Sequence, residues 1–374
     1  MLNKIKVMPL GGGQNIGSSC YYLRLGDKKF LLDCGNGYDS HGILRGPIFQ
    51  SLIDSGEVVS LSEIDAIFIS HAHYDHLGFL PVFTKNFPNI PVYATCMTKS
   101  IGKYIMNDGA KYSADEEIRI NKMLYYIHDY NYFEKIDLPG IEAMFYPAGH
   151  IAGAAMIYIK SNYGNVLYTG DFSPREAGSV GKYILPDEIN PDVVIMCGVH
   201  AKHPDFKSRD RIDAIIDEAA FYIRNNESIY LHVKQLTKGM EFVNIINKAV
   251  DDNRINECTI FYDEKISKLA QCFNEQNMSA FSVRCRPYHG YNGSRGIYIG
   301  SDAAKSRMRS IEADFSLHGD YEDICTLAEK LNPKTLMIVH TAPSKTGKGS
   351  HALERRLMNI NVCYPENGKL YNAI

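Results

Sequence analysis

The sequence predicts an α/β protein, and the pattern of apolar residues along the chain carries that prediction. Over roughly the first 200 residues, short apolar runs alternate with glycine-bounded turns, which is typical of β-strands. Beyond residue 203, strands alternate with amphipathic helices, which indicates β-α-β units on a parallel sheet. We therefore predict one unit over 1–204, a second unit inserted at 205–309, and a return to the first unit over 310–374.

The first unit is expected to consist mainly of strands. Each run that predicts one is rich in β-branched or aromatic residues and is bounded by turn residues. A helix interrupts them, because Ser113 and Glu116 form a capping box and the helical pattern continues to about Tyr126. The tyrosine-rich segment 124–133 is expected in the core or at an interface, with a platform for stacking bases as the less favoured alternative. The predicted strands lie in the segments 4–10, 20–26, 28–35, the end of 62–70, 91–96, 141–150, 154–161, 164–171 and 192–198.

The inserted unit shows apolar stripes at helical spacing, separated by short strand patterns. No repeat, low-complexity stretch or flexible linker separates it from the first unit. The predicted elements are helices at 210–226, 236–250 and 266–276 and strands at 228–233 and 257–262, followed in the returning unit by a strand that begins at residue 335.

Composition excludes several classes of protein. With 45% hydrophobic and 22% charged residues, a chain of 374 residues can bury a large core, which excludes a mostly disordered or collagen-like protein. The formal charge of −3 means that any nucleic-acid site must be a local patch. Nine scattered cysteines without a C-x-x-C pair exclude a disulfide framework and a thiolate metal site.

The first residues and the apolar runs bear on location. The opening MLNKIKVMPLGGG lacks the long apolar segment of a secretory signal. No run reaches the roughly 18 apolar residues that span a bilayer. We therefore expect a soluble, cytoplasmic protein with no membrane partner.

The segment HAHYDH at 71–76 is the strongest functional signal in the chain. His71, His73 and Asp75 lie on one side of an extended segment, and a turn brings His76 around to them. Imidazoles with a carboxylate suit Zn, Mn or Fe. Chance produces this pattern only about 0.001 times in a chain of this composition. We interpret the segment as a metal site.

Three further residues at the ends of apolar strands extend this interpretation. His150 lies on a glycine-flanked turn, Asp171 follows a strand and a glycine, and His340 ends another strand. Each alone is equally consistent with a buried histidine or a turn aspartate. Together they favour chemistry at the carboxyl ends of the strands of an α/β sheet. Four ligands can hold one metal, and a larger set can hold two.

These motifs resemble the metallo-β-lactamase fold and, within it, the β-CASP nucleases, a family that includes ribonuclease J and the endonuclease subunit of the mRNA 3′-end cleavage machinery. The resemblance covers most of the chain and implies an αββα sandwich with an inserted α/β β-CASP-like domain. The motifs that carry it are PLGGGQNIGSSCYYL, LLDCG, HAHYDHLG, YPAGHIAGAA, YTGDFS, SIYLHVKQLTKGMEF, DFSLHGD and IVHTAPS.

The resemblance implies two divalent metal ions, with zinc expected first and manganese or iron as alternatives. The reaction it implies is two-metal phosphodiester hydrolysis, with a bridging hydroxide as nucleophile. Asp75 and Asp171 then take part in catalysis as metal ligands. The implied ligands are His71, His73 and His150 for one ion, Asp75, His76 and His340 for the other, and Asp171 between the two.

The same resemblance assigns supporting roles to three residues. Asp33 matches a buried aspartate that orients the ligand loop. His318 matches a histidine that acts as general acid on the leaving oxygen, which can contribute roughly 10²–10⁴-fold. Asp320 either orients that ring or caps the following helix.

The chain departs from the family pattern in three places. Cys197 stands where the family has an acidic residue, and His200 or His203 is a candidate to replace its hydrogen bonding. Lys238 stands where the family has an arginine, and it offers a phosphate a point charge instead of a fork. The inserted unit is also short for the family.

The substrate implied by the resemblance is single-stranded RNA, because a histidine at the position of His340 accompanies RNA substrates in the family. Candidate phosphate contacts beside the expected cleft are Lys234, Lys238, Arg307, Arg309, Lys345 and Lys348. Each of these is equally well read as a solvated surface residue.

Other functions stay open from the sequence alone. The short insert and Cys197 favour a metallohydrolase that acts on DNA, a nucleotide messenger or a small ester. A non-catalytic scaffold subunit is the remaining alternative, although all seven candidate ligands are present.

Overall fold

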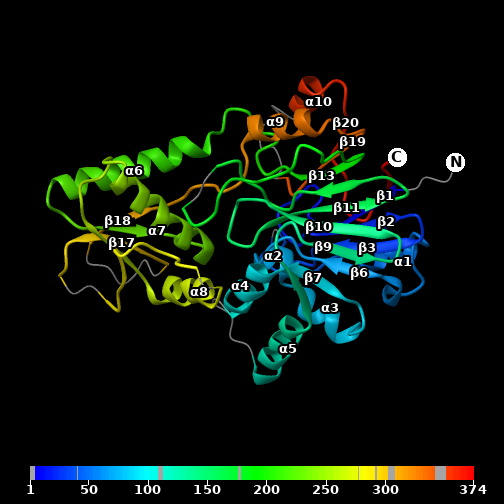
Figure 1. The fold of residues 1–374 in the computed structure, drawn as a ribbon, viewed down its shortest axis with the longest axis horizontal. Coiled ribbons are helices and arrows are strands. Elements are labelled where there is room, and N and C mark those ends of the chain that lie inside the picture. Colours follow the sequence, from blue (N-terminus) through cyan, green and yellow to red (C-terminus); the bar gives the residue numbers. More distant parts are fainter. Residues whose placement is uncertain are drawn as a thin grey trace.

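The computed structural model of the chain describes residues 5–39, 41–107, 113–175, 178–276, 278–290, 293–301, 308–341 and 351–374. Two seven-stranded sheets lie face to face with helices on their outer sides, and a third sheet with its own helices lies to one side of this sandwich (Figure 1). The mixed α/β prediction is confirmed.

The first sheet has the order β21-β1-β2-β3-β6-β7-β8. The segment HAHYDH follows its strand β6. Strands β1 to β3 form an antiparallel meander, and β3, β6, β7 and β8 run parallel. Its strands are β21 (Tyr371–Asn372), β1 (Ile5–Gly11), β2 (Cys20–Leu25), β3 (Lys28–Leu32), β6 (Ala66–Phe68), β7 (Val92–Thr95) and β8 (Ile127–Tyr130).

The second sheet has the order β20-β19-β13-β12-β11-β10-β9. Its inner strand β13 is buried at every position because elements cover both of its faces. The strands are β20 (Asn361–Cys363), β19 (Thr335–Val339), β13 (Val193–Cys197), β12 (Val166–Tyr168), β11 (Ala155–Ser161), β10 (Ile141–Pro147) and β9 (Lys135–Leu138).

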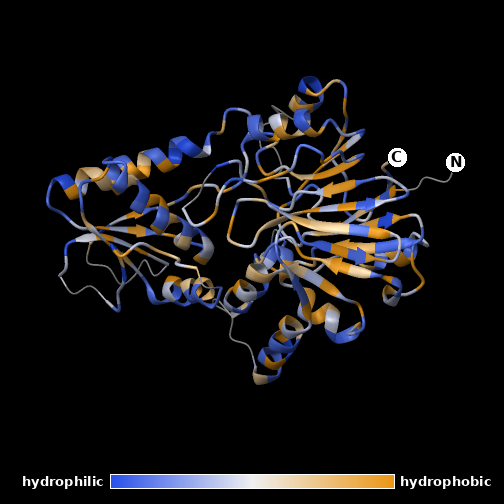
Figure 2. Cartoon of the chain, in the orientation of Figure 1, coloured by the Kyte–Doolittle hydropathy of each residue, from blue (hydrophilic) through white to orange (hydrophobic). Residues whose placement is uncertain are grey.

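The core between these two sheets follows from strand alternation. Phe30 and Leu32 of β3 point into the inter-sheet core with Phe68 and Phe145, whereas Leu31 points outward to the helices. Orange segments run along these strands in Figure 2, and the outer helices carry blue turns. Burial between the two sheets therefore fixes which strand ends meet at the rim.

The helices cover the outer faces of the sandwich. Near the first sheet lie α1 (Gln50–Asp54), α2 (Tyr74–Leu77), α3 (Leu80–Asn86), α4 (Cys96–Asn107) and α5 (Ala114–Tyr125), whereas α9 (Tyr321–Leu331) and α10 (Ala352–Arg356) lie beside the second sheet (Figure 1). A 3-10 turn at Leu61–Glu63 and a small hairpin of β4 (Gly37–Tyr38) and β5 (Leu44–Arg45) complete this part.

The third sheet is entirely parallel and has the order β16-β15-β17-β14-β18. Figure 1 shows it with its helices beyond one end of the sandwich. Its last strand begins at residue 309, where the predicted insert ends, and continues into the predicted returning unit. The predicted boundaries of the units stay predictions. Its elements are α6 (Ser208–Arg224), β14 (Ile229–His232), α7 (Leu236–Asp251), β15 (Thr259–Tyr262), α8 (Glu264–Glu275), β16 (Cys285–Pro287), β17 (Gly296–Gly300) and β18 (Arg309–Glu312).

Two segments differ in detail from their sequence patterns. The apolar strand expected at the end of residues 62–70 is β6, which is three residues long, and the start of that segment forms a 3-10 turn with a capping box between Ser60 and Glu63. In the tyrosine-rich segment, which was expected in the core or at an interface, Tyr125 and Tyr126 are 77% and 64% exposed and so lie outside the core. None of the helices in the described part of the chain is long and apolar enough to cross a membrane.

Candidate metal centre

The loop that follows β6 carries four of the candidate ligands. His71 and His73 lie on the extended segment after the strand, and Asp75 and His76 lie in the short helix α2, for which His73 is the N-cap. The turn of α2 brings His76 round toward His71, as expected, but Asp75 lies in that helix with His76 and not on an extended segment with His71 and His73.

Asp33 organises this loop from beneath, and it is fully buried. The backbone N–H of Ser70 donates to Asp33 Oδ1 at 2.6 Å. The Ser70 hydroxyl at 2.7 Å and the Tyr168 hydroxyl at 2.6 Å donate to Oδ2. The Nδ1 atom of His76 lies 2.7 Å from the same oxygen. Because Nδ1 is engaged, the Nε2 atom of His76 is left facing the other ligands.

The second sheet supplies the other three ligands from the ends of its strands. His150 follows β10, Asp171 follows β12 and His340 follows β19. His150 and His340 have φ angles of 61° and 53°, in the left-handed region that few non-glycine residues adopt. The Nδ1 atom of His150 lies 3.1 Å from the Leu317 carbonyl, so its Nε2 atom faces the site. The strained turns therefore direct these rings inward.

The seven residues form two adjacent groups, and in each group the candidate ligand atoms lie within 4.8 Å of one another. Asp171 belongs to the first group and also borders the second. Its Oδ2 atom lies 3.7 Å from His71 Nε2, 3.6 Å from His150 Nε2, 3.5 Å from His76 Nε2 and 4.0 Å from His340 Nε2. The groups are His71, His73, His150 and Asp171, and Asp75, His76 and His340.

This arrangement suits divalent cations. The other oxygen of Asp171, Oδ1, is buried and has no hydrogen-bond partner in the described part of the chain. Burial and the neighbouring imidazoles lower the pKa of His71 and His73 well below the usual range, so both rings are neutral and offer lone pairs. Burial also lowers the pKa of His76, but the charges of Asp171, Asp75 and Asp33 outweigh it and raise that pKa to about 10. The carboxylates thus favour a positive charge between them. Because the neighbouring imidazoles offer lone pairs, the cluster can hold metal ions.

Comparison with known proteins agrees with this geometry. The family model described as Metallo-beta-lactamase superfamily matches residues 14–215, which is more than half of the chain. The chain belongs to the metallo-β-lactamase superfamily. The match includes six of the seven candidate ligands and excludes His340.

Two curated relatives place the chain within this superfamily more closely. Cleavage and polyadenylation specificity factor 73 of Drosophila melanogaster is 30% identical over 297 residues, which are 75% of this chain and 41% of that protein. The Integrator complex subunit 11 homolog of Dictyostelium discoideum is 23% identical over 457 aligned positions, covering 97% of this chain and 60% of that protein. The chain therefore spans only part of the length of these relatives. Their similarity confirms the resemblance to the β-CASP family.

One solved structure shares the fold over nearly the whole chain. A protein of unknown function from Enterococcus faecalis V583 covers 98% of this chain and 99% of its own, with a TM-score of 0.63 and 14% identity. At this identity the similarity concerns the fold alone.

His318 lies at the edge of the candidate metal centre, within the reach of Asp171 and Cys197. Its Nδ1 atom lies 3.6 Å from Asp171 Oδ2 and 3.7 Å from the Cys197 Sγ atom. Its ring lies 4.6 Å from that of His150. Burial lowers the pKa of His318 well below the usual range, although the charge of Asp171 acts in the opposite direction. The thiol of Cys197 thus occupies the place beside the ring where a carboxylate was expected from the family pattern.

The other candidates of this region form no hydrogen bond with the imidazole of His318 within the described residues, although the His200 ring lies edge-on to it at 6.3 Å. Asp320 is the N-cap of α9, and its carboxylate accepts from Arg175 at 2.6 Å and from the Ser208 N–H. Of the two roles considered for Asp320, the geometry favours the cap. His200 bonds to Ser316 Oγ at 2.9 Å and stacks on Phe206.

His203 also fails to replace the missing carboxylate. Its backbone N–H donates to the His200 carbonyl and its carbonyl accepts from the Phe206 N–H, both at 3.0 Å, and within the described residues its imidazole forms no hydrogen bond. Neither histidine therefore hydrogen-bonds the ring of His318.

The six candidate phosphate contacts separate into three groups. Lys238 is half-buried, and its amine donates to the Phe315 carbonyl at 2.8 Å, three residues before His318. Lys234 and Arg309 are exposed, the first 3.9 Å from Glu312 and the second over the Tyr222 ring. Arg307, Lys345 and Lys348 lie outside the described residues.

Two residues beside the ligands were not singled out from the sequence. The Thr237 hydroxyl lies 2.8 Å from His73 Nε2, which links the start of α7 to the ligand loop. The Ser19 hydroxyl lies between His340 Nδ1 at 3.0 Å and His76 Nε2 at 3.4 Å. Both residues belong to motifs on which the family resemblance rests. Those motifs were the sequence signal by which the two residues could have been found.

Proposed function

We propose that the chain is a metal-dependent phosphodiester hydrolase whose substrate is RNA. The observation that carries the proposal is the carboxylate of Asp171, buried between two ligand groups with one oxygen lacking any described partner. A donor set of imidazoles and carboxylates without thiolate suits zinc first, with manganese or iron as alternatives.

Two divalent ions are expected, one in each ligand group. Such ions, when bound, activate a water molecule and offset the charge of the scissile phosphate. Asp33 keeps the ring of His76 in place by accepting from its Nδ1. Ser70 and Tyr168 hold Asp33 in turn, so the orientation is built into the fold.

His318 is the proposed general acid. Its Nδ1 atom faces Asp171 and Cys197, so its Nε2 atom is the one available to a substrate. The anionic phosphodiester beside the buried ring raises its pKa and favours the protonated form. Transfer of that proton to the leaving oxygen completes the cleavage.

Lys238 is the best placed of the candidate phosphate contacts. It follows Thr237, which touches His73, and its amine lies near the segment that carries His318. Burial lowers the pKa of Lys238. A phosphate therefore meets a poorly hydrated ammonium whose charge is little screened.

RNA is favoured over DNA by the family correlation at His340. The relative named cleavage and polyadenylation specificity factor 73 supports a role in cleavage. Hydrolysis of a small phosphodiester is the second candidate, and Cys197 favours it because the thiol replaces a carboxylate of the family pattern next to His318.

The test is cleavage of matched end-labelled single-stranded RNA and DNA in the presence of Zn²⁺ or Mn²⁺. Asp75→Ala should abolish metal-dependent cutting of RNA. Asp187→Ala is the matched control, because that carboxylate is 95% exposed and lies outside both ligand groups. Cutting of neither strand by metal-loaded protein would favour a small phosphodiester, and equal activity of the Asp75→Ala variant would refute the metal assignment.

A further inference from the structure

A hollow lies away from the metal centre, between α3, α5 and the first residues of β7 and β8. Its volume is about 540 Å³. Pro81, Pro88 and Pro91 form a stiff wall along α3 and the segment after it. Val92 lines this hollow at the start of β7, whereas the ligand loop follows the end of the neighbouring parallel strand β6. The two sites therefore lie toward opposite ends of these strands.

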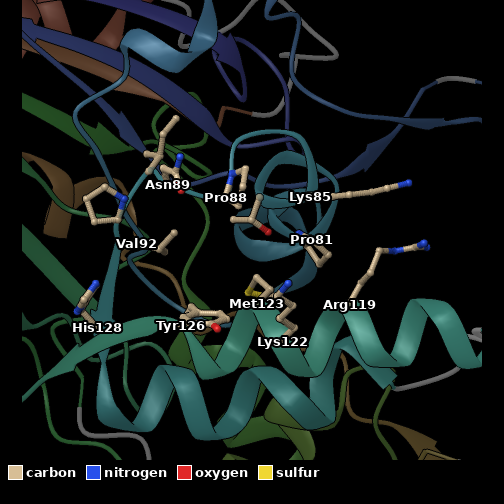
Figure 3. A pocket seen from close by; sticks show the side chains of 13 residues that line it. Pro81, Lys85, Pro88, Asn89, Val92, Arg119, Lys122, Met123, Tyr126 and His128 are labelled. Carbon is tan, nitrogen blue, oxygen red and sulfur yellow. The ribbon is translucent and has the colours of Figure 1, made fainter.

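The charge of this hollow is positive although the chain carries a net charge of −3. Lys85, Arg119 and Lys122 line it, and none of the described residues that line it is a carboxylate. Lys85 and Lys122 form no ion pair within the described part of the chain, and Arg119 meets only Glu116, at 3.8 Å. Figure 3 shows Lys85 and Arg119 extending on the same side of the hollow. Three cations without lining acids fit an anionic ligand.

Aromatic rings complete the lining. Tyr126 is 64% exposed and borders the hollow at the end of α5. His128 is exposed too, and its ring stacks on the buried Tyr93 at 5.3 Å. Exposed flat rings beside cations are the combination that binds single-stranded nucleic acid, because bases stack on the rings while phosphates meet the charges.

Strand β8 joins this hollow to the neighbourhood of the metal centre. His128 lines the first hollow, and Tyr130 lines a second hollow of about 440 Å³ that also includes Gly149 and Ile151 on either side of His150. Two residues of a strand span about 6.6 Å. The Thr95 hydroxyl at the end of β7 donates to the Gly153 carbonyl at 2.7 Å, which fixes β7 to the same loop.

We infer that the hollow at Lys85, Arg119 and Lys122 binds single-stranded RNA outside the metal centre, with a base on Tyr126, and that the strand continues along β8 toward His150. This inference rests on the proposed function, in that RNA is taken as the substrate. An acidic protein segment would satisfy the cations but leaves the exposed rings unexplained, so RNA is the better occupant.

Binding tests the inference without relying on cleavage. All proteins carry Asp75→Ala so that the RNA stays intact, and the probe is a fluorescein-labelled uridine oligomer of about 20 nucleotides. Replacing Lys85, Arg119 and Lys122 together by Gln should weaken binding at least about 10-fold. It should also reduce the salt dependence of log K by about 2, because each phosphate contact contributes roughly 0.7 on a single strand. Tyr126→Ala should weaken binding roughly 5- to 100-fold.

A matched control uses the opposite side of the molecule. Lys330→Gln, Lys334→Gln and Arg356→Gln remove the same charge at α9, α10 and the segment after α9, whereas α5 lies across the molecule from these helices (Figure 1). This variant should bind the oligomer as the parent protein does. An equal loss in both triple variants would reveal only an effect of net charge and would overturn the inference.

Cleavage separates this inference from the proposed function. In the chain with Asp75 intact, the triple variant at the hollow should cut subsaturating RNA more slowly by the factor measured in binding. It should hydrolyse bis(nitrophenyl) phosphate, which is too small to reach both sites, at the normal rate. If the triple variant binds RNA more weakly but the parent protein with Asp75 intact does not cut RNA, the hydrolase proposal is refuted and the binding site stands. Unchanged affinity and salt dependence would overturn the binding site.

Discussion

The environment of His318 disfavours the protonated form that its proposed role requires. A general acid must carry a proton, yet burial lowers the pKa of this imidazole well below the usual range. A bound phosphodiester changes that balance by placing negative charge against the ring. In the proposed mechanism, substrate binding therefore protonates the ring, and the acid is not present beforehand.

His318→Ala should slow cleavage of an ordinary phosphodiester by roughly 10²–10⁴-fold, because the leaving oxygen then departs without a proton. Hydrolysis of a nitrophenyl phosphodiester should fall much less, since that leaving group needs none. Steady-state rates on the two substrates give the ratio. His351→Ala, at a histidine that is 74% exposed, is the control. Equal losses on both substrates would exclude the general-acid role.

Gly35 is a residue at which a single methyl group should disturb the metal centre. A Cβ atom there would lie 1.8 Å from the Asp75 carbonyl oxygen, which belongs to the backbone and cannot rotate away. Gly35→Ala should displace Asp75 and His76 and weaken metal binding about 10- to 100-fold. Bound metal per chain measures the effect. Gly181→Ala, whose Cβ atom meets nothing within 4 Å, should bind metal normally.

At the scale of elements, helix α7 is tied to the sandwich by a buried carboxylate. Glu241 is 1% exposed, and it accepts from the N–H of Ser179 at 3.0 Å and from the hydroxyl of the same residue. Burial raises its pKa to about 7, although these hydrogen bonds act in the opposite direction. In the folded chain the carboxyl keeps its proton up to about pH 7, whereas a normal carboxyl loses it near 4.5. This group therefore makes stability fall as pH rises from about 4.5 to 7.

Glu241→Gln should remove that pH dependence, because the amide stays neutral and still accepts a hydrogen bond. The free energy of unfolding of the variant, relative to the native chain, should rise by up to about 3 kcal/mol between pH 5 and pH 8. Denaturant titrations at both values measure it, with Glu366→Gln as an exposed control. A difference that does not change with pH would show that Glu241 titrates normally.

Some elements could be predicted from the sequence because their determinants are local. The capping box of Ser113 and Glu116 starts α5 as expected, since its four residues contain the whole signal. The exposure of Tyr126 could not be predicted, because it depends on α5 ending beside β8, the outermost strand of its sheet. Local sequence patterns predict where a helix or strand forms. The elements packed beside it determine which of its side chains are buried.

At the scale of the whole molecule, the same distinction applies to the site. The spacing of HAHYDH brings four candidate ligands together within six residues. The contact between His73 and Thr237 joins residues 164 positions apart, and that between Asp33 and Tyr168 joins residues 135 apart. Such contacts depend on how the two sheets and the third sheet pack together. That packing cannot be read from short patterns along the sequence.

Removing the metal should destabilise the whole chain, because the carboxylates of Asp33, Asp75 and Asp171 then repel one another at a largely buried site. A ligand at 100 times its Kd stabilises a protein by about 2.7 kcal/mol. Chelation should therefore lower Tm by roughly 3–10 °C, and added zinc should restore it. Thermal melts with and without chelator measure this shift. The Tm of an Asp171→Asn variant should respond much less to the chelator.

The order of the ligands along the chain also sets an order in time. His71, His73, His150 and Asp171 are all synthesised before the third sheet begins, whereas His340 comes after that sheet is complete. At about 5–20 residues per second, the ribosome needs roughly 8–34 s to pass from Asp171 to His340. All four residues of the first ligand group are therefore synthesised well before the second group is complete. The Leu317 carbonyl that orients the ring of His150 also comes late, so the arrangement of the first group has to wait for the returning segment.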